Sequence, residues 1–392
     1  MAKLTRRATL LGAGAALGVA GTRYLKSSNP SYDGTQFIKP SGAEGMLNDA
    51  SGLSETPIHK HLILKDDPTD VLINALRAEL KEAQAAGRPL IIGAARHSMG
   101  AQAIPQNGHA ITFDNALVEP DTAAQTYHAH AGARWSNVIA TLDPIGFSPA
   151  VMQSNNDFGL AATYSVNAHG WPVPYGPMGH TVKSLRMVLP SGDLVTCSRS
   201  ENSDLFKLAM GGYGLIGLIV DMEIDMVKNQ RLLPTFEEMD ARHFGTRFVD
   251  AIKAGDVSMA YGRLNVDRAR FFEDALMITY RAAEDQSDLP AAAGSGLPSR
   301  IAARVYRWQL GNERMKRFRW WMETDVGPAT GGASTRNSLI NEPVHTLDDR
   351  NPHRTDILHE YFVTPERFPE FLEVCRAVIP KSYQEFLNVT LR

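Results

Sequence analysis

The glycine triplet Gly212, Gly214 and Gly217 constrains the fold more than any other feature of the chain. It spells G-x-G-x-x-G, which in a dinucleotide-binding fold follows a strand and opens a helix. Here the order is reversed, because a helical segment at 205–210 precedes the glycines and the β-branched run Leu218–Ile224 follows them. No helix N-terminus is then available for a pyrophosphate, which excludes a Rossmann-type site. The glycines instead predict backbone packed tightly against a flat ligand or another strand.

A second small-residue stretch, Ile91–Gly100, predicts an anion-binding loop. It begins as an apolar strand, breaks at a glycine and continues through small, cationic, imidazole and hydroxyl side chains: Gly93, Ala94, Ala95, Arg96, His97, Ser98, Met99 and Gly100. Small side chains let backbone N–H groups approach an anion closely, as a pyrophosphate requires. By itself such a loop could hold a nucleotide, a sulfate or nothing.

The segments around these two stretches alternate between helical and strand patterns. Apolar spacing predicts helices at 67–87, 134–142 and 205–210, the last capped by Asn202-Ser203-Asp204, and strands at 89–95, 110–113 and 126–131. A hairpin is predicted over 181–197, turning at Pro190-Ser191-Gly192. The small-residue run 160–166 ends in Asn167-Ala168-His169-Gly170, which again allows close approach of the main chain to a bulky ligand.

Composition excludes several classes of protein. The 392 residues are 43% hydrophobic and 21% charged, enough for two globular domains. The net charge of −3 gives no reason to expect a nucleic-acid partner. Cys197 and Cys375 are the only cysteines, too few for a disulfide framework, and no zinc pattern is present.

Two H-x-H pairs, His59/His61 and His128/His130, place imidazoles on one strand face, as some metal sites do. Because no third ligand is obvious nearby, we interpret them as polar strand faces and predict no metal.

The N-terminus predicts export. Arg6 and Arg7 directly precede the short apolar run Leu10–Ala20, a pattern that resembles a twin-arginine signal. The alternative is an amphipathic or disordered tail. No clean cleavage site follows, so a cleaved signal and a retained membrane anchor both stay open. We therefore assign 1–26 to an export signal or anchor, with a periplasmic or exported location, and 27–54, rich in Ser, Gly, Asn and Pro, to a linker.

Three segments in order resemble the flavin-binding domain of the vanillyl-alcohol oxidase and p-cresol methylhydroxylase superfamily. This superfamily includes aldonolactone oxidases, cytokinin dehydrogenases, sterol reductases and decaprenylphosphoryl-ribose oxidases. Ile91–Gly100 resembles its first pyrophosphate loop. Asn167–Gly170, followed by Gly179–Val182, resembles its second flavin loop, and Ser200–Ile219 resembles the segment that contacts the adenosine half. Family loops usually have glycine near Ala94 and Ala95 and a glycine pair at 161–162, so the loops of this chain are expected to differ in shape.

The resemblance implies an FAD-binding domain of two small α/β subdomains over 55–228. The implied cofactor-binding residues are the eight loop residues Gly93–Gly100 together with Asn167, His169, Gly170, Gly179, Thr181, Gly212, Gly214, Gly217 and Ile219. His97 stands where several members carry a histidine bonded covalently to the 8α-methyl group of the flavin. The alternative is that His97 only hydrogen-bonds near the ring, and His169 is interpreted as an ordinary flavin-loop residue.

Residues 229–392 are expected to form a mixed α+β substrate domain with an antiparallel sheet. Strands are predicted at 258–264, 357–363 and 386–392, and a helix with a solvated basic face at 315–321. In the resembled family, polar side chains of such a sheet supply the base and orienting groups. The candidate catalytic residues are therefore Tyr261, Arg263, His359, Tyr361, Asn388 and Arg392.

The whole chain is thus predicted to be an α+β FAD-dependent oxidoreductase. The expected reaction is oxidation of a CH–OH group of a sugar-, lactone- or hydroxy-acid-like small molecule by hydride transfer to flavin N5, with oxygen or a quinone as electron acceptor. The alternatives are a C=C reductase of the sterol-reductase kind and a non-catalytic flavin-binding remnant. Because an alternating strand ends at Arg392 with no closing element, we also expect the C-terminal part to be incomplete.

Overall fold

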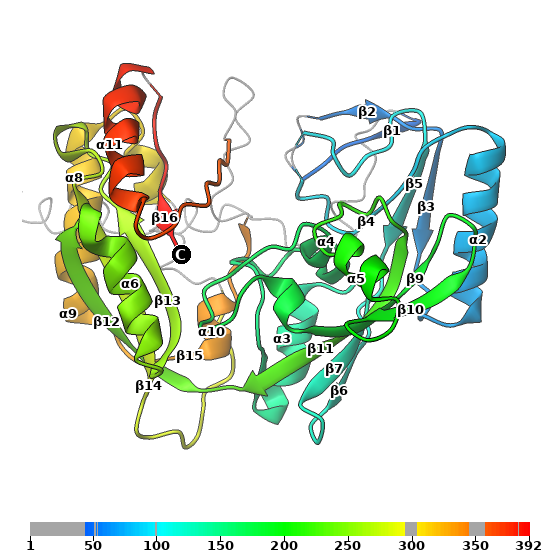
Figure 1. Cartoon of the computed structure of the whole chain (residues 1–392), viewed down its shortest axis with the longest axis horizontal. Coiled ribbons are helices and arrows are strands. Elements are labelled where there is room, and N and C mark those ends of the chain that lie inside the picture. Colours follow the sequence, from blue (N-terminus) through cyan, green and yellow to red (C-terminus); the bar gives the residue numbers. More distant parts are fainter. Residues whose placement is uncertain are drawn as a thin grey trace, which may run out of the picture.

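The computed structural model describes residues 44–50, 52, 54–98, 100–294, 304–344, 357–382 and 384–392. Its elements form two groups that lie side by side and are joined where the chain passes from residue 228 to residue 231 (Figure 1). Residues before 229 build one group, and most residues after 230 build the other. Helices and strands are mixed in both groups, which agrees with the predicted α+β class.

A three-stranded parallel sheet carries the first predicted loop. Its order is β3 (Lys60–Leu64), β5 (His109–Phe113) and β4 (Leu90–Gly93), and α2 (Asp70–Ala85) connects β3 to β4. The buried stripe Leu72, Ile73, Leu76 and Ala83 lies on one face of α2, which explains why this segment is helical. The predicted helix and strand are confirmed, and β4 ends at the glycine where the loop begins.

An antiparallel sheet lies beside it (Figure 1). Its order is β10 (Leu194–Ser198), β9 (Val182–Val188), β11 (Leu218–Lys228), β7 (Thr126–His130) and β6 (Val118–Asp121), with β8 (Phe147–Pro149) also paired to β11. The β9–β10 pair is the predicted hairpin. Its neighbouring helices are α3 (Trp135–Leu142), α4 (Leu160–Ser165) and α5 (Ser203–Ala209). Since α5 precedes the glycine triplet and β11 follows it, the exclusion of a Rossmann-type site is confirmed.

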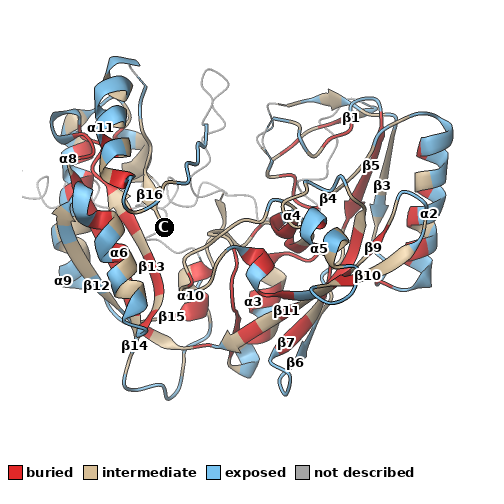
Figure 2. Ribbon diagram, viewed as in Figure 1, coloured by how far each residue is buried: buried red, intermediate tan, exposed pale blue. Residues whose placement is uncertain are grey.

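A five-stranded antiparallel sheet organises the second half. Its order is β15 (Ser334–Thr335), β12 (Arg231–Asp240), β14 (Asp274–Ala282), β13 (Val257–Leu264) and β16 (Thr390–Leu391). Its helices are α6 (Phe244–Lys253), α8 (Glu313–Trp321), α9 (Gly327–Thr330), α10 (Arg336–Ile340) and α11 (Phe368–Val378). Buried positions concentrate on the sheets and on the inner faces of the helices (Figure 2). One apolar core runs from α2 to Ile340, so the two groups share buried contacts.

Two strands predicted in the second half differ from the structure: the one at 357–363 is not formed, and the one at 386–392 is shorter than predicted. Residues 357–363 are irregular, and Leu358 and Phe362 are 89% and 82% exposed. The predicted strand at 386–392 shrinks to Thr390–Leu391, which pairs with Gly262 and Arg263 of β13. An alternating sequence forms a strand only where a partner presents its N–H and C=O groups, and among the described residues the partner of 357–363 is missing.

The predicted linker is partly folded. β1 (Met46–Leu47) pairs with β2 (Thr56–Pro57), and Leu47 is buried in a small core with Ile104 and Ala110. This contact could not be predicted from the Ser/Gly/Asn-rich segment, because a single buried leucine produces no apolar periodicity. The signal segment and most of the predicted linker lie outside the described residues.

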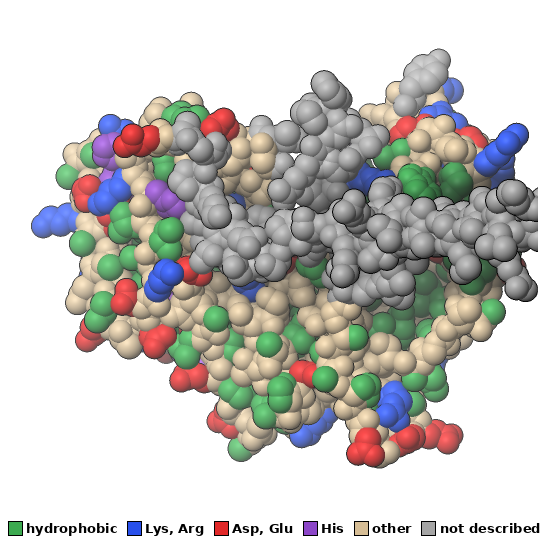
Figure 3. Space-filling model, turned by 180° about the vertical axis from the view of Figure 1, so that it is seen from behind, with side chains coloured by type: hydrophobic (Ala, Val, Ile, Leu, Met, Phe, Trp, Pro, Cys, Tyr) green, Lys and Arg blue, Asp and Glu red, His purple; other side chains and the backbone are tan. Residues whose placement is uncertain are grey.

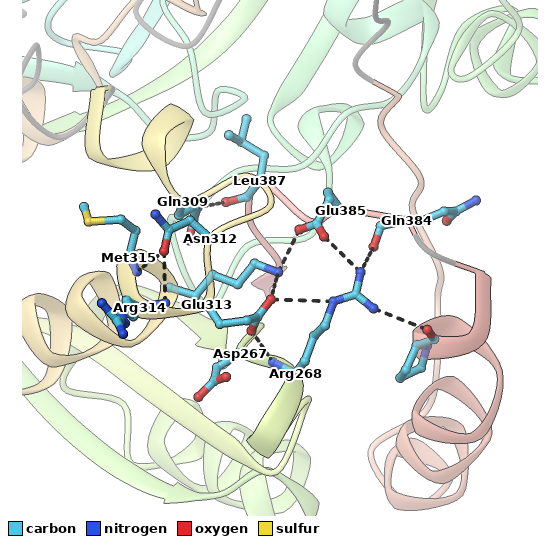
Figure 4. Close-up of polar contacts among 12 residues, drawn as sticks. Asp267, Arg268, Gln309, Asn312, Glu313, Arg314, Met315, Gln384, Glu385 and Leu387 are labelled. Carbon is cyan, nitrogen blue, oxygen red and sulfur yellow. Dashed lines mark hydrogen bonds and ion pairs between the residues drawn. The ribbon is translucent and has the colours of Figure 1, made fainter.

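Helix α8 also differs from its prediction. It forms where expected, but Lys316 and Arg319 are buried rather than solvated. Lys316 Nζ lies 2.8 Å from Glu313 Oε1 and 2.7 Å from Glu385 Oε2. Figure 4 shows Arg268 bridging the same two carboxylates. This network fastens the C-terminal segment to α8 and so holds the residues that lead into β16.

The N-terminal cap of α5 differs from its prediction. Asn202 does not cap α5 with its side chain; its Nδ2 donates to the carbonyl of Thr196 instead. Cys197 and Cys375 are free. Within the described part of the chain, no group of three potential metal ligands is found, and no helix is long and apolar enough to cross a membrane.

His130 leads to a prediction about acid stability. It is fully buried, and its Nδ1 accepts a hydrogen bond of 2.9 Å from Gly132 N–H. Burial lowers the pKa of His130 to about 4, below the ordinary value of 6.5 expected for the unfolded chain. Between these values the unfolded chain binds the extra proton, so stability falls as the pH drops from 6.5 to 4. We expect this one residue to cost about 3 kcal/mol over that interval.

His130→Asn is the matched variant, because Asn Oδ1 can accept the Gly132 hydrogen bond but does not titrate. Urea unfolding at pH 7 and pH 4 should show the wild-type protein losing more free energy of unfolding than His130→Asn. Burial raises the pKa of Asp157 to about 6, so this residue changes the free energy of unfolding with pH in the opposite direction. It does so equally in both proteins, and its contribution cancels when the two are compared. Parallel pH curves for the two proteins would contradict the assignment.

Candidate functional site

Arg96 lies at the centre of the first loop. It is 4% exposed, and its Nη2 donates to Thr112 Oγ1 at 2.6 Å and to the carbonyl of Ile111 at 3.4 Å. Nε and Nη1 are buried without a hydrogen-bond partner among the described residues. Burial lowers the pKa of Arg96 to about 10, so the side chain is cationic at neutral pH. A buried cation with two unsatisfied donors suits an anion such as the diphosphate of FAD.

The backbone of this loop is strained at Arg96, whose φ is +51°. Ala94 and Ala95 are buried with ordinary φ, so the left-handed conformation falls on the arginine rather than on the positions where family loops carry glycine. The guanidinium group lies over Gly93, where an added Cβ would meet Arg96 Cγ at 3.2 Å. A left-handed non-glycine residue persists only where its surroundings enforce it, and such residues cluster at ligand sites.

The far end of the loop is held by a carboxylate that sequence reasoning missed. Asp49 Oδ2 accepts hydrogen bonds from the N–H groups of Gly100 and Ala101 at 2.8 and 3.0 Å. These two donors are therefore engaged by the protein, and the anion-binding capacity of the loop rests on its earlier part. Ser98 is exposed, and Met99 lies outside the described residues.

His97 is enclosed by a second residue pair that sequence reasoning missed. Its Nε2 lies 3.5 Å from Asp157 Oδ2, and the two side chains are 6% and 4% exposed. The ring of Phe158 stacks on the imidazole with centroids 4.4 Å apart and planes 24° apart. The only sequence signal was an acidic and an aromatic residue directly before the small-residue run.

The second predicted loop is shaped by packing of the protein against itself. Asn167 has φ +47°, and its Oδ1 accepts a hydrogen bond from Gly179 N–H at 3.0 Å. A Cβ on Gly170 would lie 1.8 Å from the carbonyl oxygen of Met152, and one on Gly179 would lie 1.9 Å from Met210 Sδ. These glycines are required because other parts of the chain approach them closely.

Most of the remaining predicted cofactor residues also contact other parts of the protein. A Cβ on Gly212 would lie 2.1 Å from the carbonyl oxygen of Leu208, and one on Gly217 would lie 3.0 Å from that of Val188. Gly214 has φ +74° and open space around it. Thr181 is buried with its hydroxyl donating to the carbonyl of Met178, and Ile219 belongs to the main core. Gly212 thus packs against its own helix and Gly217 against the neighbouring strand β9, which is one of the two arrangements that the sequence predicts, whereas Gly214 lies in open space.

The second loop runs directly onto the five-stranded sheet. Ala260 N–H donates to the carbonyl of Trp171 at 3.0 Å, and the rings of Trp171 and Tyr261 lie 4.6 Å apart. His169 Nε2 lies 2.5 Å from Glu360 Oε1, and Arg392 Nη1 lies 3.4 Å from His169 Nδ1. Arg392 also donates to Ser154 Oγ. His169 therefore joins the second loop to the C-terminal segment.

Four of the six predicted catalytic residues gather at this junction. The Arg263 guanidinium lies over the Tyr261 ring at 4.9 Å and donates to Thr390 Oγ1. Asn388 Nδ2 also donates to Thr390 Oγ1, at 3.0 Å. Burial lowers the pKa of Arg392 to about 10, with a further contribution from the nearby Arg263.

His359 and Tyr361 do not join this cluster. They are exposed and contact each other, with His359 Nδ1 3.3 Å from the Tyr361 hydroxyl. Glu360, which lies between them, reaches His169 instead. The error follows from assigning 357–363 to a strand, because in a strand alternate residues share a face, and Glu360 was placed on the opposite one.

Further polar residues behind the cluster were not predicted. Tyr306 donates to Glu323 Oε1 at 2.6 Å, Arg319 lies over the Tyr306 ring at 5.1 Å, and burial raises the pKa of the Tyr280 hydroxyl. These residues come from segments far apart in sequence, so no local motif could have identified them.

Comparisons with known proteins agree with this geometry. A family model described as an FAD-binding domain matches residues 73–198, which include both loops around Arg96 and His169. L-galactono-1,4-lactone dehydrogenase 2 of Oryza sativa is 25% identical over 177 residues, 45% of this chain and 30% of that protein. D-arabinono-1,4-lactone oxidase of Yarrowia lipolytica is 27% identical over 269 residues, 65% of this chain and 48% of that protein.

A third relative, cytokinin dehydrogenase 1 of Arabidopsis thaliana, is 29% identical over 136 residues, 33% of this chain and 24% of that protein. The chain thus spans less than half the length of each of these three relatives. The loop order, the buried cationic loop and the family match lead to one conclusion. Residues 73–198 form an FAD-binding domain, and this domain together with the named relatives supports placing the chain among FAD-dependent oxidoreductases of the vanillyl-alcohol oxidase and p-cresol methylhydroxylase superfamily.

Proposed function

We propose that this protein oxidises a CH–OH group of a sugar- or lactone-like small molecule. The observation that carries the proposal is the junction at which His169 of the second flavin loop meets Glu360, Arg392 and the β13 side chains Tyr261 and Arg263. Two of the relatives are named for aldonolactone oxidation, which supports this substrate class.

His169 and Glu360 have the arrangement of a base and its orienting carboxylate. With the Nε2 proton directed at Glu360, the lone pair lies at Nδ1, where Arg392 Nη1 donates to it at 3.4 Å, so a substrate hydroxyl has to replace this weak contact before Nδ1 accepts its proton. Arg392 stabilises negative charge that develops on the substrate oxygen. Bound FAD supplies a two-electron acceptor at N5. In this proposal His169 takes the hydroxyl proton, and Tyr261 and Arg263 orient the substrate.

Anaerobic mixing with L-galactono-1,4-lactone and with D-arabinono-1,4-lactone tests the proposal. We expect one of them to bleach the flavin absorbance and His169→Gln to slow the bleaching by about 100-fold at unchanged FAD content. His180→Ala, at an exposed histidine nearby, should bleach at the wild-type rate. A yellow protein that neither lactone bleaches would contradict the substrate class, and a His169→Gln variant of wild-type rate would remove the base.

We further propose that FAD is attached covalently through His97. The enclosed imidazole beside the loop supports this, because burial holds the ring in one position. In the wild-type protein the yellow colour should remain with acid-precipitated protein, whereas His97→Ala should release its flavin into the supernatant. Release from both proteins would leave FAD binding intact and exclude the bond.

The electron acceptor and the location complete the proposal. Oxygen or a quinone accepts the electrons, and a twin-arginine-like signal exports the protein or anchors it at the membrane. On the face shown in Figure 3, basic and acidic side chains are interspersed, which suits a small-molecule enzyme better than a nucleic-acid-binding protein.

A further inference from the structure

His61 belongs to one of the two H-x-H pairs of the sequence, for which a polar strand face is the predicted role. Its Nε2 lies 2.8 Å from Thr112 Oγ1, within the parallel sheet that carries the first loop. His59, the other member of the pair, has its ring 5.2 Å from the ring of His109. The two histidines therefore have different surroundings, and His61 is connected through Thr112 with the loop around Arg96.

The order of the parallel sheet brings these side chains together. Thr112 of the central strand β5 pairs with Gly93 of β4, and Ala110, two residues earlier on the same face, pairs with His61 of β3. The side chains of His61 and Thr112 therefore lie on one face. Gly93 leaves room on this face, because a Cβ there would meet Arg96 Cγ and Nε at 3.2 Å. The guanidinium group thus lies over β4 and reaches Thr112.

The hydrogen bonds of this cluster have a fixed direction. Arg96 can only donate, so Thr112 Oγ1 accepts the bond of 2.6 Å from Nη2. Burial, together with the charge of Arg96, lowers the pKa of His61 to about 4, and the imidazole is neutral at pH 7. The Thr112 hydroxyl hydrogen can then be donated to the lone pair of His61 Nε2. The chain of donors runs from Arg96 through Thr112 to His61.

We propose that Thr112 and His61 are positioning residues that hold the Arg96 guanidinium ready for the diphosphate of FAD. Thr112 is fully buried and occupies Nη2, which leaves Nε and Nη1, the two nitrogens without a hydrogen-bond partner among the described residues, for the anion. An arginine that folding has already fixed loses little side-chain freedom when the ligand binds, and this raises affinity. The proposal rests on the cofactor-binding role of Arg96 and not on the identity of the substrate.

Thr112→Val tests the proposal, because valine keeps the shape of threonine but removes the acceptor for Arg96. Fluorescence titration of the FAD-free full-length protein with FAD measures the affinity, and every protein carries His97→Ala so that binding is reversible. We expect Thr112→Val to bind FAD about 10-fold more weakly and Thr112→Ser, which restores the hydroxyl, to bind within about 2-fold of the parent protein.

Thr279→Val is the matched control. Thr279 is also buried, in β14 of the second half, and its Oγ1 accepts a hydrogen bond of 2.7 Å from Arg281 Nη1. The same substitution there removes the same kind of threonine–arginine contact. We expect Thr279→Val to keep the FAD affinity of the parent protein, and urea unfolding of both variants shows how much stability each change removes.

A pair of variants at His61 keeps the proposal testable if Thr112→Val fails to fold, because His61 is only partly buried. His61→Gln retains an acceptor near the position of Nε2, whereas His61→Leu removes it. We expect His61→Gln to bind FAD like the parent protein and His61→Leu to bind it about 3-fold more weakly. Equal affinities of these two variants would contradict the role of His61.

A double-mutant cycle decides whether Thr112 acts through Arg96. In an Arg96→Met background, Thr112→Val should cause no further loss of FAD affinity. An equal loss in both backgrounds would overturn the proposal, as would a Thr112→Val variant with the affinity of the parent protein. If Arg96→Met itself bound FAD normally, the proposal would fail with its premise. A protein that binds FAD but is bleached by neither lactone would contradict the proposed substrate class and leave this inference intact.

Discussion

Gly170→Ala is expected to destabilise the folded protein by about 3–5 kcal/mol and to abolish FAD binding. The added Cβ would lie 1.8 Å from the carbonyl oxygen of Met152 and 3.0 Å from its carbonyl carbon. Both are backbone atoms, so relief requires the second flavin loop to move away from the chain behind it. Because His169 and Trp171 flank this position, the same movement would separate the loop from β13.

Gly176→Ala provides the control for this change. Gly176 belongs to the same segment, has an ordinary φ, and an added Cβ there would meet only His180 Nδ1 at 3.5 Å. Urea unfolding and FAD titration should show Gly176→Ala close to wild type. If Gly170→Ala were equally stable and bound FAD, the close approach of the two backbones in the second loop would be wrong.

Arg96→Met should lower the affinity for FAD by about 100-fold while barely changing the stability of the FAD-free protein. Removing a buried cation from an anion costs several kcal/mol in binding. In the free protein, however, the lost hydrogen bonds to Thr112 and Ile111 are offset, because a buried guanidinium with two unsatisfied nitrogens is itself costly. The free energy of unfolding should therefore change by less than about 1 kcal/mol.

Arg336→Met separates this effect from the general loss of a buried arginine. Arg336 is equally buried, burial lowers its pKa to about 10, and its Nη2 donates to the carbonyl of Ala150 at 2.7 Å. It lies in α10, away from the loop around Arg96 (Figure 1). We expect this variant to lose stability but to keep its FAD affinity. Equal losses of affinity in the two variants, measured by fluorescence titration, would show that Arg96 has no special role toward the cofactor.

Local patterns predicted most of the first half of the chain. The apolar stripe of α2, the strand ending at Gly93 and the β9–β10 hairpin follow from the periodicities of their own residues. The order of α5, the glycine triplet and β11 excluded a Rossmann-type site. These features depend on contacts within a few residues or on one repeated spacing, which a sequence displays directly.

The functional junction could not be predicted in the same way. Asp157 meets His97, and Glu360 meets His169, only because distant segments pack against one another. The strand predicted at 357–363 failed for a related reason: strand formation depends on a partner that alternation alone does not supply.

The sequence by itself determined where the chain bends around small residues and which loops suit a dinucleotide cofactor. The tertiary structure decided which charges are buried and which face each other, because a pairing such as Asp157 with His97 depends on packing and desolvation across the whole fold.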